Sequence, residues 1–195
     1  HVSGTIGAVG NNATGVAGVN WAVSLLGVKV LGADGSGSGE SIIAGLNYVV
    51  NQKSRGLNIR VANMSLGGWM EPIDNPDTNP YALAHKAVSD AGIVLAVAAG
   101  NEYQNMENPG GPGSDPEHPA YDYRVELNYP ACFHFANMIT VASITSARVL
   151  SDFSNYGSAY VQLAAPGSAI LSTTKEGGYA SGYGTSMACP HVAGA

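Results

Sequence analysis

The sequence predicts an α/β fold of three layers, in which a mostly parallel, twisted sheet lies between helices. Apolar runs of strand length at 22–31, 59–66, 93–99 and 138–143 are separated by longer segments, some with helical spacing. Strands that alternate with helices favour a parallel sheet, because each helix carries the chain back to the start of the next strand. The length of 195 residues is normal for one domain with a sizeable core.

Composition excludes several classes of protein. Charged residues make up 11%, hydrophobic residues 45%, and there are 26 glycines, which suits a compact globular protein and not a disordered chain. The net charge is −6 and the eight basic residues are scattered, so we expect no nucleic acid as a partner. The longest apolar stretch, around 93–100, is too short to cross a bilayer, so we expect no membrane insertion. Cys132 and Cys189 are either buried free thiols or one disulfide.

The first predicted strand, 22–31, is rich in Val and Leu, and a glycine-rich loop at 32–39 follows it. The next segment is predicted to be a helix with an apolar stripe. The stripe consists of Ile42, Ile43, Leu46, Val49 and Val50. A strand, a glycine-rich loop and a helix also build nucleotide sites. We disfavour a phosphate site, because the loop has no lysine and its Gly-x-Gly-x-Gly spacing departs from the dinucleotide fingerprint.

The second buried strand, 59–66, leads into a loop at 69–80 that is rich in Pro, Asp and Asn. A helix is predicted to begin near Pro80, because proline suits the first turn of a helix. It is predicted to close at Gly92, because glycine suits the position just after the last turn. The third strand, 93–99, follows directly.

The most informative motif lies at the C-terminal end. Residues 184–194 read Gly-Thr-Ser-Met-Ala-Cys-Pro-His-Val-Ala-Gly. This order places a serine where a turn passes into a helix, so that helix N–H groups lie behind its hydroxyl. Thr or Ser as a helix cap would account for that position alone. The order of the whole string, however, resembles the nucleophile segment of the subtilisin-like serine peptidases.

The resemblance covers nearly the whole chain and is interrupted by the loops after Gly68 and Asn101. It implies a serine endopeptidase that hydrolyses polypeptides through an acyl-enzyme and an Asp-His-Ser triad. Ser186 would be the nucleophile. Asn101 ends an Ala-Ala-Gly-Asn string and would donate to the oxyanion, where negative charge grows during acyl transfer. Taken alone, an asparagine after a glycine is also an ordinary turn residue.

The resemblance also implies how a peptide would bind. The residues of the two flanking edges would be Gly35, Ser36 and Gly37 on one side and Ser65, Leu66 and Gly67 on the other. A peptide would add between these edges as a strand, because glycine keeps an edge free of side chains. Gly100 would border the same cleft. The residues of an apolar pocket for a substrate side chain would be Leu31, Ile42 and Leu66.

The opening residues resemble the back half of the family's histidine motif, His-Gly-Thr-His-Val-x-Gly-Thr. His1 matches the second histidine, whereas the catalytic base is the first, so we reject His1 as the base. The base would lie three residues before His1, and the orienting aspartate further upstream. We therefore expect 1–195 to be a single, partial peptidase domain, truncated at both ends. We expect it to be inactive alone, because a serine without its base is weakly nucleophilic.

The other histidines have no catalytic motif around them. His191 comes five residues after Ser186, more than one helical turn away, so we expect it to pack or bond locally. His85, His118 and His134 are expected to have surface or structural roles.

The loop at 10–18 is a Gly/Asn turn by composition, and the family often places a structural calcium ion there. The candidate ligands are the Asn12 side chain and the carbonyls of Val9, Thr14 and Val16, because hard cations take oxygen ligands. No cofactor is expected for catalysis. The resemblance further implies a secreted protein and a cis peptide bond at Tyr129–Pro130, and we expect a monomer.

Residues 103–128 depart most from the short loop of the family. This segment carries the acidic residues Glu107, Asp115, Glu117 and Asp122, among others. They would favour basic or neutral substrate side chains before the cut, unless the segment is simply a solvated surface flap.

Two other classes remain open. One is an inactive homologue or a peptide-binding module that keeps the cleft and has lost the base. The other is an α/β-hydrolase esterase, because Gly-Thr-Ser-Met-Ala nearly fits its nucleophile motif. That fold needs a strand immediately before the serine turn, and we expect residues 177–183 to be a Gly/Tyr loop.

Overall fold

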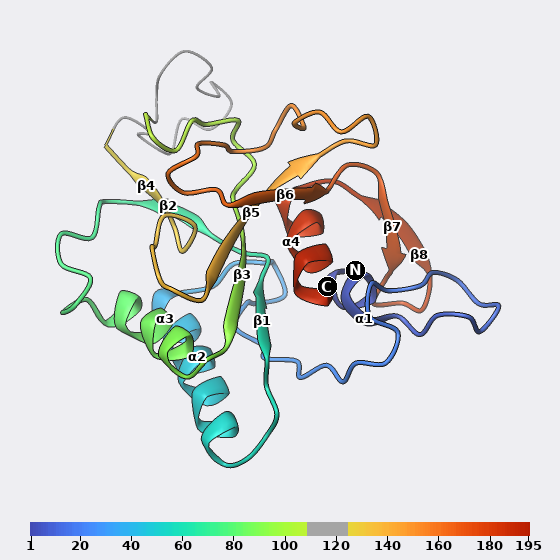
Figure 1. Cartoon of the computed structure of the whole chain (residues 1–195), viewed down its shortest axis with the longest axis horizontal. Helices are drawn as coiled ribbons and strands as arrows, with labels where there is room; N and C mark the ends of the chain where they lie inside the picture. The colour runs from blue at the N-terminus through green and yellow to red at the C-terminus, as the bar shows by residue number, and fades with distance from the viewer. Residues whose placement is uncertain (109–124) are drawn as a thin grey trace.

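The computed structural model describes residues 1–108 and 125–195. Its central sheet has four parallel strands in the order β1-β3-β5-β6 (Figure 1). Their bounds are β1 Val61–Met64, β3 Val94–Ala98, β5 Met138–Ile144 and β6 Leu163–Pro166. The predicted three-layer α/β class is confirmed, with helices on both faces of this sheet.

Helices α2 (Gly39–Ser54) and α3 (Pro80–Asp90) pack together on one face. The N-terminus of α2 carries a capping box, in which the Ser38 hydroxyl accepts the Ser41 N–H. Helix α3 begins as its sequence predicts, with Asn79 as the cap and proline in the first turn. On the opposite face, α4 (Thr185–Gly194) packs against the sheet, and α1 (Val2–Gly7) packs against α4.

Two hydrophobic clusters hold these layers together. The larger one lies between the sheet and α2 and α3, and Leu46, Val88 and Leu95 are among its members. The smaller one joins β3 and β5 to α4, with Ala98 and Val141 of the sheet packed near Ala188 and Cys189 of the helix. The small residues of α4 therefore allow the helix to lie close to the sheet.

Two antiparallel ribbons flank the sheet. Strand β2 (Gly68–Met70) pairs with β4 (Leu127–Tyr129), and β7 (Ile170–Thr173) pairs with β8 (Tyr179–Gly182). The expectation of a loop at 177–183 was wrong, because backbone pairing with β7 makes most of this glycine-rich stretch a strand. That strand belongs to a separate two-stranded ribbon. An α/β-hydrolase would instead need a strand of the central sheet immediately before the serine turn.

The predicted strand at 22–31 is also absent, and most of these residues are exposed. A strand needs a partner for its backbone N–H and C=O groups. In the described part of the chain, β1 is an edge strand that pairs only with β3. Within this run, Val28 packs against the larger cluster and Val30 lies close to Gly45 of α2, whereas Val23, Leu25 and Leu26 are exposed.

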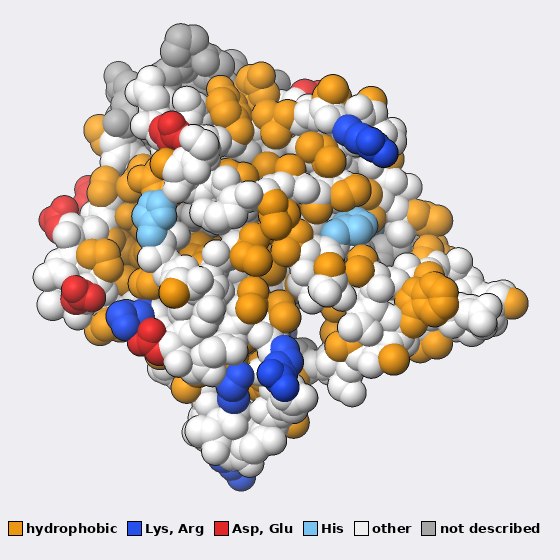
Figure 2. Space-filling view, in the orientation of Figure 1, with side chains coloured by type: hydrophobic (Ala, Val, Ile, Leu, Met, Phe, Trp, Pro, Cys, Tyr) orange, Lys and Arg blue, Asp and Glu red, His pale blue; other side chains and the backbone are white. Residues whose placement is uncertain are grey.

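The Tyr129–Pro130 peptide bond is cis, as expected. Both cysteines are free and buried, which decides between the two predicted states. None of the helices in the described ranges is long and apolar enough to span a membrane. On the face shown in Figure 2, the Lys and Arg side chains lie in separate places and form no single patch.

Candidate active site

The candidate site lies at the carboxyl edge of the parallel sheet. The chain leaves β1 through Ser65 and Gly67, and it leaves β3 through Gly100 and Asn101. Carboxyl ends of neighbouring parallel strands meet at one edge, and the N-terminus of α4 reaches the same edge. The residues that line the resulting cleft are Leu66, Gly67, Ala98, Gly100, Asn101, Glu102, Asn128, Thr185 and Ser186.

Ser186 lies in the first turn of α4 and is half-buried. Its hydroxyl donates to the carbonyl of Ser65 at 3.4 Å, and the Ser65 hydroxyl donates to the Ser186 carbonyl at 2.9 Å. Asn63 supports this pair, because its side-chain N–H donates to the Ser65 hydroxyl at 3.0 Å. Ser65, which follows β1, and the predicted nucleophile Ser186 are thus joined by two direct hydrogen bonds.

The alternative explanation of this position, a Thr or Ser that caps the helix, does not hold. Gly184 is the N-cap, with φ 139° and ψ 160°, and no side chain caps the helix. This backbone region is open essentially only to glycine. The glycine therefore allows the sharp turn that exposes Ser186 at the start of the helix.

The Asn101 side chain is oriented by its neighbour in α4. Its Oδ1 accepts the Thr185 N–H at 2.8 Å and the Thr185 hydroxyl at 3.0 Å. The Thr185 oxygen in turn accepts the Gly100 N–H at 3.0 Å. With its oxygen fixed in this way, Asn101 is left with its Nδ2 donor at the cleft, where the residue is exposed.

This arrangement suits stabilisation of a developing oxyanion beside Ser186. Asn101, which carries a side-chain N–H donor, and Thr185 and Ser186 of the first turn of α4 line the same cleft, and the Thr185 N–H is already bonded to the Asn101 oxygen. Such donors act most strongly where they are held in place before the reaction, and the two bonds from Thr185 hold Asn101.

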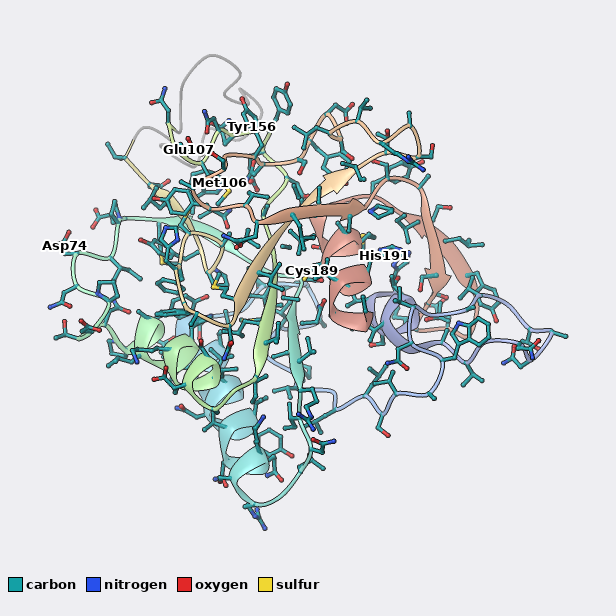
Figure 3. All side chains as sticks on the ribbon, in the orientation of Figure 1. Asp74, Met106, Glu107, Tyr156, Cys189 and His191 are labelled. Carbon is teal, nitrogen blue, oxygen red and sulfur yellow. The ribbon has the colours of Figure 1, made fainter. Side chains whose placement is uncertain are left out.

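No histidine in the described ranges hydrogen-bonds to the Ser186 hydroxyl, whose partner is the Ser65 carbonyl. His1 lies against the β7–β8 ribbon, with Nε2 at 2.9 Å from the Ile170 carbonyl and 3.1 Å from the Ala180 carbonyl. His191 bonds within its own helix, with Nδ1 at 2.9 Å from the Met187 carbonyl. In Figure 3, His191 lies on the side of α4 toward β7, and Cys189 on the side toward β3.

Two further histidines have structural positions. His85 is fully buried, and its Nδ1–H donates to the Tyr81 carbonyl at 2.7 Å. Burial lowers the pKa of His85 from 6.5 to about 4. His134 stacks on Tyr160 with ring centroids 4.9 Å apart. The local and structural roles predicted for these rings agree with their surroundings, and His118 lies outside the described residues.

Only one of the two predicted substrate edges borders the cleft. Leu66, Gly67 and Gly100 line it, and Ser65 bonds to Ser186. The residues of the other edge, Gly35, Ser36 and Gly37, are exposed and do not belong to the lining. The backbone groups of Ser36 are engaged locally, because its N–H donates to Asp34 at 3.1 Å and its carbonyl accepts the Gly32 N–H at 2.7 Å.

The three residues of the predicted apolar pocket are divided in the same way. Leu66 lines the cleft and packs against the larger core cluster. Ile42 packs against the same cluster from α2, without reaching the cleft lining. Leu31 is half-buried beside the loop that contains Gly37.

The candidate metal loop offers few ligands for calcium. Asn12 and Thr14 are exposed, and the Asn12 Oδ1 already accepts the Thr14 N–H at 3.1 Å. The described residues contain no cluster of three or more His, Cys, Asp or Glu side chains. Calcium takes six to eight oxygen ligands, so the single side chain and three carbonyls at Val9, Thr14 and Val16 do not complete a site.

Three of the acidic residues named for 103–128 lie outside the described residues, namely Asp115, Glu117 and Asp122. The Glu107 carboxylate accepts hydrogen bonds from the Ala159 N–H at 2.7 Å and from the Ser158 hydroxyl at 3.0 Å. These bonds lower the pKa of Glu107 and tie its charge to a neighbouring loop. Its effect on substrate side chains stays a prediction.

Sequence reasoning missed several residues of the site. Asn128 and Glu102 line the cleft, Thr185 orients Asn101, and Asn155 supports the turn after β3. Asn155 stands in the string Phe-Ser-Asn-Tyr-Gly at 153–157, between a short polar side chain and an aromatic one. Its role depends on contacts with residues more than 50 positions away, which no local pattern reveals.

The family model described as Subtilase family matches residues 1–195 of this chain. "Subtilisin-like serine protease AsES" from Sarocladium strictum is 43% identical over 196 residues, covering 100% of this chain and 42% of that protein. The "Major intracellular serine protease" of Bacillus subtilis (strain 168) is 42% identical over 196 residues, covering 100% of this chain and 52% of that protein. A crystal structure of a cold-adapted subtilisin-like serine proteinase matches with a TM-score of 0.73 at 34% identity, covering 100% of this chain and 57% of that one. The chain therefore spans about half the length of these relatives.

Proposed function

The chain belongs to the subtilase family, and from this premise we propose that the whole protein is a serine endopeptidase acting on polypeptides. The observation that carries this proposal is the meeting of Ser186 and Asn101 in one cleft, with the Asn101 oxygen fixed by Thr185. The cleft thus combines a hydroxyl nucleophile with oriented N–H donors, which is the minimum that acyl transfer requires besides a base.

In the proposed reaction, Ser186 Oγ attacks the scissile carbonyl while its proton passes to the histidine base proposed to lie outside residues 1–195, and a tetrahedral intermediate forms. The Asn101 Nδ2 and the Ser186 backbone N–H donate to the oxygen that becomes negative. The protonated histidine would give the proton to the leaving amine, which departs and leaves an acyl-enzyme that water then hydrolyses. In subtilisin, a member of this family, removing one oxyanion donor lowers kcat by about 10²–10³, a value measured for that enzyme.

The base and its orienting aspartate are proposed to lie outside residues 1–195. Support comes from the surroundings of Ser186, because its hydroxyl bonds to the Ser65 carbonyl and to no imidazole among the described residues. His1 Nε2 contacts the Ile170 carbonyl of β7, and His191 Nδ1 contacts the Met187 carbonyl within its own helix. We therefore propose that residues 1–195 form one incomplete catalytic domain, which does not hydrolyse peptides alone.

A fluorophosphonate probe, which labels activated serines, tests this proposal on the whole protein and on residues 1–195. We expect the whole protein to be labelled, with labelling lost in Ser186→Ala, and the isolated chain to remain unlabelled. A folded whole protein that resists labelling would instead favour an inactive homologue or a peptide-binding module. Ser186-dependent labelling of the isolated chain would return His1 to consideration as the base.

Structural calcium is proposed for the whole protein only, with Asn12 and the carbonyls of Val9, Thr14 and Val16 supplying part of the ligand set. The remaining ligands would have to come from other residues, because the loop alone does not fill a calcium shell. Thermal unfolding with and without calcium tests this, and we expect a higher Tm with calcium that Asn12→Ala abolishes. Equal Tm values under both conditions would remove calcium from the proposal.

Secretion and a monomeric state are likewise proposed for the whole protein. Secretion is supported only by the family resemblance, and one relative carries the name of an intracellular protease. Fractionation of the source cells, with immunodetection of the protein in the medium and in the cell extract, tests localisation. Sedimentation of the purified protein tests the monomer.

A further inference from the structure

The turn after β3, which carries Asn101, is held from behind by one buried side chain. Asn155 is 0% exposed. Its Oδ1 accepts the backbone N–H of Glu102 at 3.1 Å and that of Gln104 at 2.8 Å. These two N–H groups lie immediately beyond Asn101, so the side chain fixes the course of the backbone there.

The other half of the Asn155 amide grips the same turn. Its Nδ2 donates to the Ala99 carbonyl at 2.9 Å and to the Glu102 carboxylate at 2.6 Å. The backbone N–H of Asn155 donates to the Gly100 carbonyl at 3.1 Å. One residue therefore bonds to the turn both before and after Asn101.

The turn needs such support because its backbone is unfavourable at Tyr103, which has φ +52° in the left-handed region that residues with a side chain rarely adopt. Gly100 also has a positive φ, +101°, which a glycine adopts without this cost. A Cβ at Gly100 would meet the Asn155 amide nitrogen. Conformations of this kind persist only where surrounding contacts determine them, and Asn155 supplies most of the side-chain bonds to this turn.

Beyond the turn, the segment at 103–106 and the segment at 153–156 lie side by side and are joined by backbone hydrogen bonds. Tyr103 N–H donates to the Phe153 carbonyl at 2.8 Å, and Met106 N–H donates to the Tyr156 carbonyl at 2.8 Å. Figure 3 shows Met106, Glu107 and Tyr156 side by side in this region. Asn155 is the point at which this loop pair reaches the candidate active site.

We propose that Asn155 is a positioning residue for the oxyanion donor Asn101. This inference rests on the proposed function and assigns a task to a residue behind the cleft. Asn155 is not itself a donor to substrate, because both polar atoms of its buried side chain are bonded to the turn. Thr185 sets the direction of the Asn101 side chain, and Asn155 sets the backbone from which that side chain extends.

The kinetic test is Asn155→Ala in the whole protein with a peptide substrate. We expect kcat to fall by about tenfold to a hundredfold, less than the loss of a donor outright. We expect KM to change by less than about threefold, because an oxyanion exists only after the ground state. An unchanged kcat overturns the proposal.

A double-mutant cycle separates positioning from general loss of structure. If Asn155 acts through Asn101, then Asn155→Ala has little effect on kcat once Asn101→Ala is present. The same fold-loss in both backgrounds overturns the proposal, because the buried amide would then act on some other part of the site.

If Asn155→Ala does not fold, the variant Asn155→Asp tests the proposal in its place. Asn155→Asp keeps an acceptor for the two N–H groups but removes the donor and faces the Glu102 carboxylate with a like charge. We expect this variant to lose kcat and the pair Asn155→Asp with Glu102→Gln to regain part of it, because the new amide can donate to the new carboxylate. The matched control is Asn137→Asp, which loses a bond to the Ser89 carbonyl away from the cleft and should leave kcat unchanged.

Hydrogen exchange keeps the two proposals distinguishable. In Asn155→Ala, the Glu102 and Gln104 amides should exchange at least about tenfold faster, while the amides of β5 keep their protection. If these two amides stay protected, Asn155 does not hold the turn and the inference fails whatever the activity. If the unchanged whole protein is folded and inactive, the proposed function fails, and exchange alone decides whether Asn155 holds the turn.

Discussion

The amide oxygen of Asn101 accepts two hydrogen bonds from Thr185, from its backbone N–H at 2.8 Å and from its hydroxyl at 3.0 Å. These bonds join the end of β3 to the first turn of α4, although the two residues are 84 positions apart in sequence. They also take up the acceptor side of the amide. What remains for the cleft is the donor side, which is the side that an oxyanion needs.

This relationship predicts different results for two substitutions at the buried Thr185. Thr185→Val keeps the shape but removes the hydroxyl that bonds to Asn101 and accepts from Gly100. Losing these bonds should lower the free energy of unfolding by about 1–3 kcal/mol and reduce kcat of the whole protein about tenfold. Thr185→Ser keeps the hydroxyl and should retain most of kcat. Urea unfolding and steady-state kinetics measure both, and equal kcat values for the two variants would contradict the proposed orientation of Asn101.

The buried ring of His85 predicts a pH-dependent stability. Its pKa is about 4 in the folded protein, against 6.5 ordinarily, because burial disfavours the charged ring. Well above pH 6.5 the ring is neutral in both the folded and the unfolded state, so the free energy of unfolding does not depend on its protonation. As the pH falls from about 6.5 to about 4, only the unfolded chain gains the proton, so the free energy of unfolding should fall by about 3 kcal/mol.

The matched variant for this effect is His85→Phe, which keeps a ring against Tyr81 and Phe133 and cannot titrate. Burial raises the pKa of the neighbouring Tyr81 to about 12, so this side chain does not titrate between pH 4 and 7. Urea midpoints measured across this range should diverge between the native chain and the variant as the pH falls. Parallel curves would mean that His85 has the same pKa in the folded protein as in the unfolded chain, which would contradict the effect of burial.

The two thiols predict a simple labelling result. Burial raises the pKa of Cys132 and of Cys189 to about 12, so neither is a thiolate at pH 8. A thiol reagent at pH 8 should modify neither cysteine in the folded protein and both after unfolding in guanidinium. Rapid reaction of one thiol in the folded protein would contradict its burial, and Cys189→Ser identifies which one reacts.

The sequence was sufficient for the layers of the fold where local chemistry decides the structure. Pro80 marks the start of α3, and apolar runs mark β1, β3 and β5. It was insufficient at 22–31, because an apolar run does not reveal whether a backbone partner is present. It was also insufficient for β8, because pairing with β7 overrides the low strand preference of its glycine-rich sequence.

The candidate site shows the same division. Ser186 and Asn101 are in strings that resemble a family motif, so both could be named from the sequence. Asn155 and Thr185 act through hydrogen bonds to segments between about 50 and 85 residues away, and such pairs become visible only in the folded chain. The edge at Gly35–Gly37 was implied by the same resemblance, yet its Ser36 backbone groups bond within their own turn.

The turn at Gly184 supports a last prediction about how Ser186 is presented. Gly184 has φ 139° and ψ 160°, a conformation that costs other residues about 1–3 kcal/mol. A Cβ there would lie 3.4 Å from the Asn101 Oδ1, which is an ordinary contact, so the expected cost of an alanine comes from its backbone conformation. Gly184→Ala should therefore lower the free energy of unfolding by about that amount and slow fluorophosphonate labelling of Ser186 in the whole protein. The control is Gly27→Ala, where a Cβ meets no atom within 4 Å and stability should change by less than about 0.5 kcal/mol. Labelling of Gly184→Ala at the native rate would show that the exposed position of Ser186 does not depend on this glycine.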